Sequence, residues 1–324
     1  MIYFVLVVLF MFKKVLVPTD FSAYAHKMQE CLSEIPGIEE IVLLNVIDAS
    51  NPMNLEKRGW SYSSLIEEGQ VRLAEQADRL VHLGEGKDRS PTVRNVLKVI
   101  VAPMSGADGV NLQWPPSSDP SMMIEGGSVA EAIIRTAKEE KASLICMGAQ
   151  GKGLAEGMLL GSVSTEVLRK GETDLLIFRH SILAGGEKAG PPDLCRNILT
   201  RVMVATDFSP AAGAAVSRAE GLCGTKELML VNVISKDEEF GEAAAKLNLL
   251  RERLASPGRT VSVHVLQGRP TDQILSLAEK KMPSLILMGS QGKSWSRQIR
   301  VGSTTFDVTR KTSCPVMVVR PMES

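Results

Sequence analysis

Two glycine-rich segments of this 324-residue chain have the residue types and spacing of a phosphate-binding loop. The first runs Gly148-Ala-Gln-Gly151, then nine residues, then Gly161 and a serine. The second repeats this spacing from Gly289 to Ser303. Because glycine permits positive φ angles and a close approach of the backbone, successive N–H groups of such a loop can surround an anion. The spacing therefore predicts two phosphate sites.

A helical pattern of apolar residues follows each of these segments. The unpaired N–H groups and the positive dipole end of a helix start favour phosphate. The alternative is an ordinary strand-to-helix turn with a serine cap. Hydroxyl groups that could add donors are those of Ser162, Ser164, Ser303 and Thr305.

Lys152 and Lys293 directly follow the second glycine of each segment. A Walker motif needs four residues between its glycines, and only two are present here, so these segments are not P-loops. Each lysine either neutralises phosphate charge or is simply solvated. The sequence has no G-x-G-x-x-G after its first apolar run, which disfavours a Rossmann dinucleotide site.

Asp20 and Asp207 end the apolar runs that we expect to be first strands. A carboxylate at that position can accept a hydrogen bond from a ribose hydroxyl or an adenine amine, and the alternative role is a helix N-cap. Val46 and Val233 end the expected second strands. Their backbone could pair with a base edge, or they could be ordinary core.

The chain is an internal duplication. Val15–Ser22 recurs as Val202–Ser209, 187 residues further along, and Ile41–Ile47 recurs at the same offset. At Leu144 the offset has fallen to 141, so the first copy contains 46 additional residues. We expect domain one at 11–181, an irregular insert at about 84–120, a linker rich in Gly and Pro at 182–194, and domain two at 195–321.

Each copy alternates short apolar runs, typical of strands buried on both faces, with amphipathic helical patterns. This alternation predicts an α/β fold with two repeated open, mostly parallel five-stranded sheets flanked by helices. Such sheets bind ligands at the carboxyl ends of their strands. The third strand of the first copy is either Val96–Val101 or Ser121–Ile124, and alignment of Gly127 with Gly268 favours the second.

The composition excludes several classes of protein. Lys+Arg and Asp+Glu both number 37, and this zero net charge argues against a polyanion binder. Aromatic residues are only 4%, so stacking platforms for single-stranded nucleic acid are not expected. The five cysteines form no C-x-x-C pair, so we expect neither a disulfide framework nor a metal held by protein ligands, and a reducing cytoplasm is the default location.

Residues 1–12 form a continuous apolar run. The run is shorter than the about 20 residues that a spanning helix needs. It is an upstream extension before a natural start at Met11, a strand or helix packed on the core, or a membrane anchor. The first interpretation is favoured, and no membrane association is expected.

Together these motifs resemble the universal stress protein family, in tandem form. The resemblance rests on Val17-Pro-Thr-Asp-Phe-Ser22 and its second copy, on the repeated Asn-Val-Ile segment that begins at Asn45, and on both glycine loops. It covers Met11 to Pro321 except the linker and the insert. In this family the glycine loop marks ATP-binding members. The resemblance therefore implies an adenine-nucleotide fold that binds ATP or AMP, with a divalent ion (Mg or Mn) held through the phosphates of ATP.

The family pattern implies one nucleotide site in each repeat. In the first it places Pro18, Thr19, Asp20 and Val46 at the adenosine, Gly127 near the ribose, and Gly148, Gly151, Gly161, Ser162 and Ser164 at the phosphates. In the second the matching residues are Thr206, Asp207, Val233, Gly268, Gly289, Gly292, Gly302, Ser303 and Thr305. The second repeat has Ala205 where the first has Pro18, and the first has Val129 where the second has Pro270, so equal occupancy is not assured.

Members of the family usually dimerise through the last strand. The resemblance therefore implies that residues 175–179 and 315–320 pair within the chain as an intramolecular pseudo-dimer, to which a homodimer could be added. We expect a nucleotide-binding stress-response or regulatory protein. Slow ATP hydrolysis, with Ser303, Lys293, Arg297 and Arg300 as contributors, ranks second because no general base can be named. An ATP-dependent ligase ranks last because its S-G-G-x-D-S or H-x-G-H signatures are absent.

Overall fold

The structure is a computed structural model that describes residues 12–32, 35–50, 62–84, 90–101, 122–150, 160–179, 197–293 and 300–321. The expected N-terminal extension and the linker lie outside these residues. So do residues 85–89 and 102–120, which make up about two thirds of the expected insert.

The first repeat alternates strands and helices, as its apolar runs predict. Its elements are β1 (Lys14–Pro18), α1 (Ala23–Leu32), β2 (Glu40–Ala49), α3 (Tyr62–Gly84), β3 (Thr92–Val101), β4 (Met123–Glu125), α4 (Val129–Glu139), β5 (Leu144–Gly148), α5 (Ser162–Lys170) and β6 (Asp174–Phe178).

The second repeat has the same order without an equivalent of β4. Its elements are β7 (Arg201–Ala205), α8 (Pro210–Glu220), β8 (Glu227–Ile234), the 3-10 turn η2 (Asp237–Glu239), α9 (Phe240–Leu254), β9 (Thr260–Gln267), α10 (Pro270–Lys281), β10 (Leu285–Gly289), α11 (Ser303–Lys311) and β11 (Val316–Val319).

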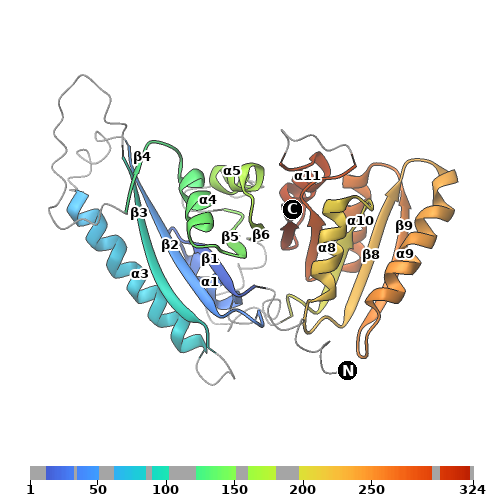
Figure 1. The fold of residues 1–324 in the computed structure, drawn as a ribbon, viewed down its shortest axis with the longest axis horizontal. Helices are drawn as coiled ribbons and strands as arrows, with labels where there is room; N and C mark the ends of the chain where they lie inside the picture. Colours follow the sequence, from blue (N-terminus) through green and yellow to red (C-terminus); the bar gives the residue numbers. More distant parts are fainter. Residues whose placement is uncertain are drawn as a thin grey trace.

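All of these strands belong to one sheet, in the order β4-β3-β2-β1-β5-β6-β11-β10-β7-β8-β9. Strands within each repeat pair in parallel, and the two repeats join where β6 and β11 pair antiparallel. The register at this seam places Met317 opposite Leu176. The seam lies at the middle of the molecule (Figure 1), and it confirms the predicted intramolecular pseudo-dimer.

The prediction for the third strand of the first repeat is wrong. Thr92–Val101 pairs with β2 over its whole length, and Met123–Glu125 is an additional short strand that pairs with the end of β3. The first repeat therefore contributes six strands rather than five. In the second repeat Gly268 directly follows the third strand, β9, whereas in the first repeat the insert separates Gly127 from β3. Aligning the two glycines therefore points to the wrong strand.

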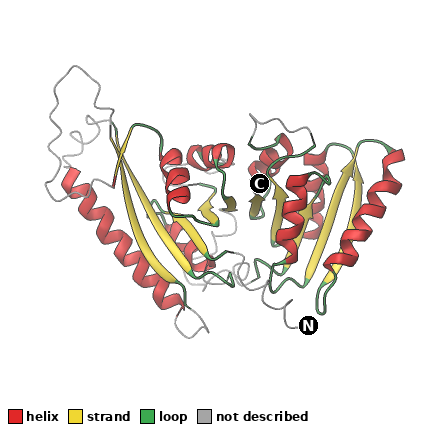
Figure 2. Cartoon of the chain, in the orientation of Figure 1, coloured by secondary structure: helices red, strands yellow, loops and turns green. Residues whose placement is uncertain are grey.

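Helices cover both faces of the sheet (Figure 2). Successive side chains of a strand point to opposite faces, so they pack against different layers of helices. On β1, Val15 and Val17 join a buried cluster with α1, α3, α8 and α9, whereas Leu16 joins a second cluster with α4, α5, α10 and α11. This double burial explains why the strands read as uninterrupted apolar runs.

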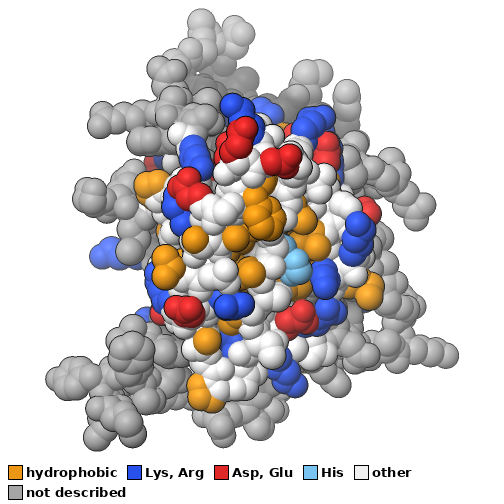
Figure 3. Space-filling model, turned by 90° about the vertical axis from the view of Figure 1, so that its right-hand side faces the viewer, with side chains coloured by type: hydrophobic (Ala, Val, Ile, Leu, Met, Phe, Trp, Pro, Cys, Tyr) orange, Lys and Arg blue, Asp and Glu red, His pale blue; other side chains and the backbone are white. Residues whose placement is uncertain are grey.

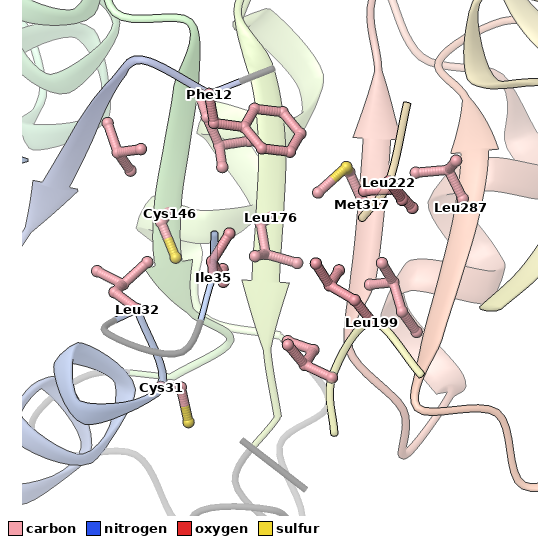
Figure 4. Close-up of a cluster of buried hydrophobic side chains, with 14 of the residues drawn as sticks. Phe12, Cys31, Leu32, Ile35, Cys146, Leu176, Leu199, Leu222, Leu287 and Met317 are labelled. Carbon is pink, nitrogen blue, oxygen red and sulfur yellow. The ribbon is translucent and has the colours of Figure 1, made fainter. Parts of the chain in front are cut away.

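The first of these clusters continues across the seam. Figure 4 shows Leu176 of β6 facing Met317 of β11, with Leu32 and Cys146 on one side and Leu287 on the other. Phe12, the last residue of the apolar N-terminal run, is buried in the same cluster. A shared core of this kind makes the two repeats one packed unit.

The cysteines differ in their states. Cys146, Cys223 and Cys314 are free, whereas Cys31 is disulfide-bonded. The sequence analysis did not anticipate a disulfide at that position.

The sheet ends at β4 on one side and at β9 on the other. Figure 3 shows the β9 end of the molecule, where hydrophobic side chains are interspersed with charged ones. Charges around an exposed edge strand discourage pairing with other chains. No helix within the described ranges is long and apolar enough to cross a membrane.

Candidate functional site

The first strand of each repeat ends in a turn whose side chains bind the backbone of the turn itself. In the first repeat the Thr19 hydroxyl accepts from the Phe21 N–H at 3.1 Å, and Asp20 Oδ1 accepts from the Ser22 N–H at 3.0 Å. Phe21 has a φ angle of 60°, a left-handed conformation unusual for an aromatic residue. These hydrogen bonds stabilise that conformation.

The second repeat reproduces this turn at Thr206, Asp207 and Phe208, where the φ angle of Phe208 is 63°. The residue that caps the following helix is the serine, because Ser209 Oγ accepts from the Ala212 N–H. The alternative role considered for the aspartate, a helix N-cap, therefore belongs to the residue two positions further on.

A buried asparagine fixes each turn to the neighbouring strand. Asn45 Nδ2 donates to the Thr19 carbonyl at 2.9 Å, and Asn232 Nδ2 donates to the Thr206 carbonyl at 2.8 Å. Asn45 and Asn232 begin the repeated Asn-Val-Ile segment, and the sequence alone does not indicate this role for them.

Val46 does not end its strand, contrary to the prediction, because β2 continues to Ala49. It nevertheless lies beyond the end of β1. The Thr19 N–H donates to the Leu44 carbonyl, so the Leu44 backbone faces β1. Since backbone groups alternate sides along a strand, the backbone of Val46 faces the same side, past the last residue of β1. Val233 has the equivalent position, because the Thr206 N–H donates to Val231.

Each glycine loop connects a strand to a helix: the first connects β5 to α5, and the second connects β10 to α11. In the first loop Gly148 ends β5 and Gly161 is the N-cap of α5. The Gly161 N–H donates to Ala149 at 2.8 Å, and the buried Ser164 hydroxyl donates to the Gly148 carbonyl at 2.8 Å. These bonds hold the helix start against the strand end. Gly151 and Lys152 lie outside the described residues.

The second loop has the same bonds. The Gly302 N–H donates to Ser290 at 2.7 Å, and Thr305 Oγ1 donates to the Gly289 carbonyl at 2.8 Å. Ser164 and Thr305 thus already use their hydroxyl protons on the backbone, which limits them to accepting or positioning roles.

Both helix starts leave their first N–H groups without a side-chain cap. Gly161 and Gly302 occupy the N-cap positions of α5 and α11, and neither helix has a side-chain cap hydrogen bond. The next residues, Ser162 and Ser303, are exposed. A helix start of this kind offers N–H donors and a positive dipole end to an anion.

The second loop also contacts the first-strand turn of its repeat. Asp207 Oδ2 accepts from the Lys293 N–H at 2.8 Å, while its other oxygen binds the turn. A Cβ atom on Gly292 would lie 2.8 Å from the same oxygen, so a larger residue there would displace the Asp207 carboxylate. Asp207 therefore joins the two segments that the sequence assigned to one site. The side chain of Lys293 is exposed.

A cavity of about 980 Å³ opens at the carboxyl ends of β1, β2 and β5. It brings together predicted residues that are far apart in sequence, namely Pro18, Thr19, Asp20, Val46, Gly148, Gly161, Ser162 and Ser164. This is the edge of the sheet at which open α/β folds bind ligands. The volume is at the upper end of the range for small-molecule sites, roughly 300–1,000 Å³.

The cavity also has walls that the sequence analysis did not identify. They come from the turn and α1, from α3, and from α4 and β5: Phe21, Met28, Leu65, Glu68, Gly69, Arg72, Ile133 and Met147. Arg72 lies over the Phe21 ring, 5.5 Å from its centre, and pairs with Glu68 at 2.8 Å. Amphipathic periodicity could have marked α3 as a helix, but no motif marks which of its residues line a cavity.

Gly127 lies in a separate hollow of about 440 Å³, beside Glu131 and Arg135. Its φ angle is +89°, and the following Ser128 begins α4 with a capping box to Glu131. In the second repeat Gly268 precedes α10, where Pro270 is in the first turn. The two repeats thus begin the same helix by different means.

One cation that the sequence suggested for hydrolysis already has a partner. The Arg300 guanidinium forms an ion pair with Glu172 of the first repeat. Arg297 lies outside the described residues.

Comparisons with known proteins agree with this architecture. An Archaeoglobus fulgidus universal stress protein of known structure is 26% identical, has a TM-score of 0.69, and aligns over 96% of this chain and 100% of its own. A universal stress protein of Mycolicibacterium smegmatis is 28% identical over 212 residues, which are 60% of this chain and 66% of that protein. Slr1230 of Synechocystis, also a universal stress protein, is 31% identical over 123 residues, or 38% of this chain and 43% of its own.

The chain thus covers less than two thirds of the length of these two curated relatives. The sequence model of the universal stress protein family matches twice, at residues 11–179 and 199–320, one match for each repeat. These two matches extend over most of the chain, and the chain belongs to the universal stress protein family.

Proposed function

We propose that the protein binds an adenine nucleotide, ATP or AMP, at one site in each repeat and acts as a stress-response or regulatory protein in the cytoplasm. The observation that carries this proposal is the cavity of the first repeat. Its lining combines the Thr-Asp turn, an apolar strand position and an uncapped helix start at one edge of the sheet.

Each part of the cavity suits one part of a nucleotide. The open backbone of Val46 can pair with the edge of a base, and Ile133 and Met147 add apolar side chains to the same cavity. Asp20, which also lines the cavity, would accept a hydrogen bond from a ribose hydroxyl. The first N–H groups of α5 and the hydroxyl of Ser162 would bind phosphate oxygens. For ATP, a Mg or Mn ion would be held through the phosphates.

The second site would use the same groups. Thr206, Asp207 and Val233 follow the geometry of the first repeat, and α11 begins at Ser303 after an uncapped glycine. Gly289, Gly292 and Gly302 would keep the loop backbone close to the phosphates.

The test begins with protein purified without added nucleotide, from which any ligand is released and identified by mass spectrometry. Thermal unfolding is then measured with ATP, AMP, GTP and CTP. A ligand at 100 times its Kd stabilises a one-site protein by about 2.7 kcal/mol. For a domain of this size that is a Tm rise of roughly 5–10 °C.

The control variant combines Val46→Trp with Val233→Trp, which places a bulky ring in each proposed base position. We expect it to fold, because both valines are only partly buried, and to lose the response to ATP and AMP. If neither adenine nucleotide raises the Tm of the unmodified protein and none is released from it, the proposal is wrong.

Slow ATP hydrolysis remains the alternative that the same preparation can test. Steady phosphate release by the unmodified protein, absent from a Gly302→Ala, Ser303→Ala variant, would favour that activity over binding alone.

A further inference from the structure

The two final strands are each followed by a buried arginine that reaches into the other repeat. Arg179 and Arg320 are only 6% and 7% exposed. Because β6 and β11 run antiparallel, the end of each strand lies beside the start of the other. Arg179 donates to the Thr309 carbonyl in the last turn of α11, and Arg320 Nη2 donates to the Leu168 carbonyl in the last turn of α5 at 2.6 Å.

Arg320 makes a second contact, with the loop of the second candidate site. Its Nη1 donates to the Arg300 carbonyl at 2.7 Å. Arg300 stands two residues before Gly302, the N-cap of α11. One guanidinium therefore joins the C-terminal end of α5 in the first repeat to the residues that lead into the phosphate end of the second site.

Neighbouring charges hold this arginine in place. The backbone N–H of Arg320 donates to Asp174 Oδ1 at 2.8 Å. The other carboxylate oxygen of Asp174 pairs with the guanidinium of Arg218 at 2.9 Å. Glu172, two residues before β6 begins, pairs with the side chain of Arg300. The loop of the second site is thus held at Arg300 in two ways: its side chain pairs with Glu172 of the first repeat, and its carbonyl binds Arg320, which itself contacts the first repeat.

Burying the charged guanidinium of Arg320 costs desolvation free energy, which a residue that only filled space would not incur. Burial lowers the pKa of Arg320 to about 10, which still leaves the guanidinium charged at neutral pH. Its Nε has no hydrogen-bond partner among the described residues. The charge is favoured by the carbonyl end of α5, where the helix dipole is negative. An apolar residue would avoid the desolvation but could not bind two carbonyls at once.

We propose that Arg320 is a positioning residue of the second nucleotide site, acting across the seam between the repeats. By binding the carbonyls of Leu168 and Arg300 together, it sets the place of Arg300–Gly302 and hence of the first N–H groups of α11. This inference rests on the proposed function. It makes the affinity of the second site depend on contacts with the first repeat, which no isolated second repeat would have.

The test measures nucleotide affinity at each site separately by isothermal titration calorimetry. The Val46→Trp variant leaves only the second site, and the Val233→Trp variant leaves only the first. Arg320→Lys is introduced into both, because a single ammonium keeps the charge but lacks the fork that spans two carbonyls. We expect the Kd of ATP at the second site to rise about tenfold, as for the loss of a hydrogen bond to a charged group. At the first site we expect a change of less than about threefold.

Arg201→Lys is the matched control, because the Arg201 guanidinium also spans two carbonyls, those of Lys281 and Met282, but at the start of β7, the opposite end of that strand from the candidate site. It should lower the Tm and leave the Kd at the second site unchanged. Equal weakening at both sites by Arg320→Lys, or none at the second site, would show an ordinary packing role and overturn the inference.

If Arg320→Lys does not fold, Glu172→Gln decides. It removes the exposed ion pair with Arg300, and we expect the Kd at the second site to rise about two- to threefold; an unchanged Kd would contradict the proposal. A Val46→Trp protein that binds no nucleotide would remove the second site itself and this inference with it. If the Val46→Trp protein binds nucleotide and Arg320→Lys does not change its Kd, the positioning role alone is wrong.

Discussion

The buried asparagines beside the first-strand turns offer a sharp test of how the candidate sites are built. Asn45 is 7% exposed and Asn232 is 5% exposed, and each donates one hydrogen bond to the carbonyl that precedes the aspartate. Replacement by alanine would leave that carbonyl buried without its donor. The turn that carries the aspartate would then be held from one side only.

The expected loss of stability follows from the burial of these carbonyls. An unsatisfied buried carbonyl costs about 1–3 kcal/mol, so Asn45→Ala and Asn232→Ala should each lower the free energy of unfolding by that amount. Asn45→Asp should cost more, because it points a second acceptor at the Thr19 carbonyl. If the two positions act independently, the double alanine variant should lose roughly the sum of the single effects.

Urea unfolding measures these differences, and Asn95→Ala provides the control. Asn95 is an exposed asparagine on β3, so its replacement should change the unfolding free energy by less than about 0.5 kcal/mol. We also expect Asn45→Ala to weaken ATP binding at the first site, because Asp20 follows the loosened carbonyl. An Asn45→Ala variant as stable as the control, or an Asn45→Asp variant no worse than alanine, would refute the reasoning.

Three further outcomes follow from the geometry of the described residues. Gly289→Ala should destabilise by about 1–3 kcal/mol in urea unfolding, because its Cβ would lie 2.5 Å from the Ala211 backbone, whereas Gly148→Ala should cost less because the closest atom would be 3.1 Å away. Thr305→Val should cost about 1–3 kcal/mol by removing the donor to the Gly289 carbonyl, and Thr305→Ser should restore it. Burial, together with the charge of Lys281, lowers the pKa of His264 below its usual 6.5, so the folded state favours the neutral ring. Stability should therefore fall as the pH drops below about 6.5, because the unfolded chain then binds the proton more readily. His264→Gln should flatten this dependence of Tm on pH.

Features set by local physical chemistry could be predicted from the sequence. Continuous apolar runs such as Leu144–Met147 belong to strands buried on both faces, and the recurrence of the motifs identified the duplication. The glycine spacing predicted where a strand end meets a helix start. Each of these signals is contained in a short stretch of sequence.

Features set by tertiary contact could not be predicted in this way. β3 lies next to β2 because its whole length pairs there, yet the alignment relied on one glycine that the insert displaces from the strand. The α3 residues Leu65, Gly69 and Arg72 line the cavity only because the first half of this helix packs beside the end of β2, where Gly69 lies next to Asn45 and Ile47. The apolar run before Arg320 predicts only a strand that ends there, and the contact of Arg320 with Leu168 of the other repeat depends on the antiparallel register of β6 and β11.

The comparison of the two repeats separates residues that matter for their side chains from residues that matter for their backbone. Pro18 and Ala205 both end a first strand whose next N–H donates to the second strand, so the exchange leaves the turn unaltered. The capping box of Ser128 and the proline of α10 likewise begin equivalent helices. A site built largely from main-chain N–H groups tolerates such exchanges. Unequal occupancy of the two sites should therefore arise from the helices that pack on the two turns, where Arg72 of α3 lies over Phe21 and Lys246 of α9 lies over Phe208, rather than from the loops themselves.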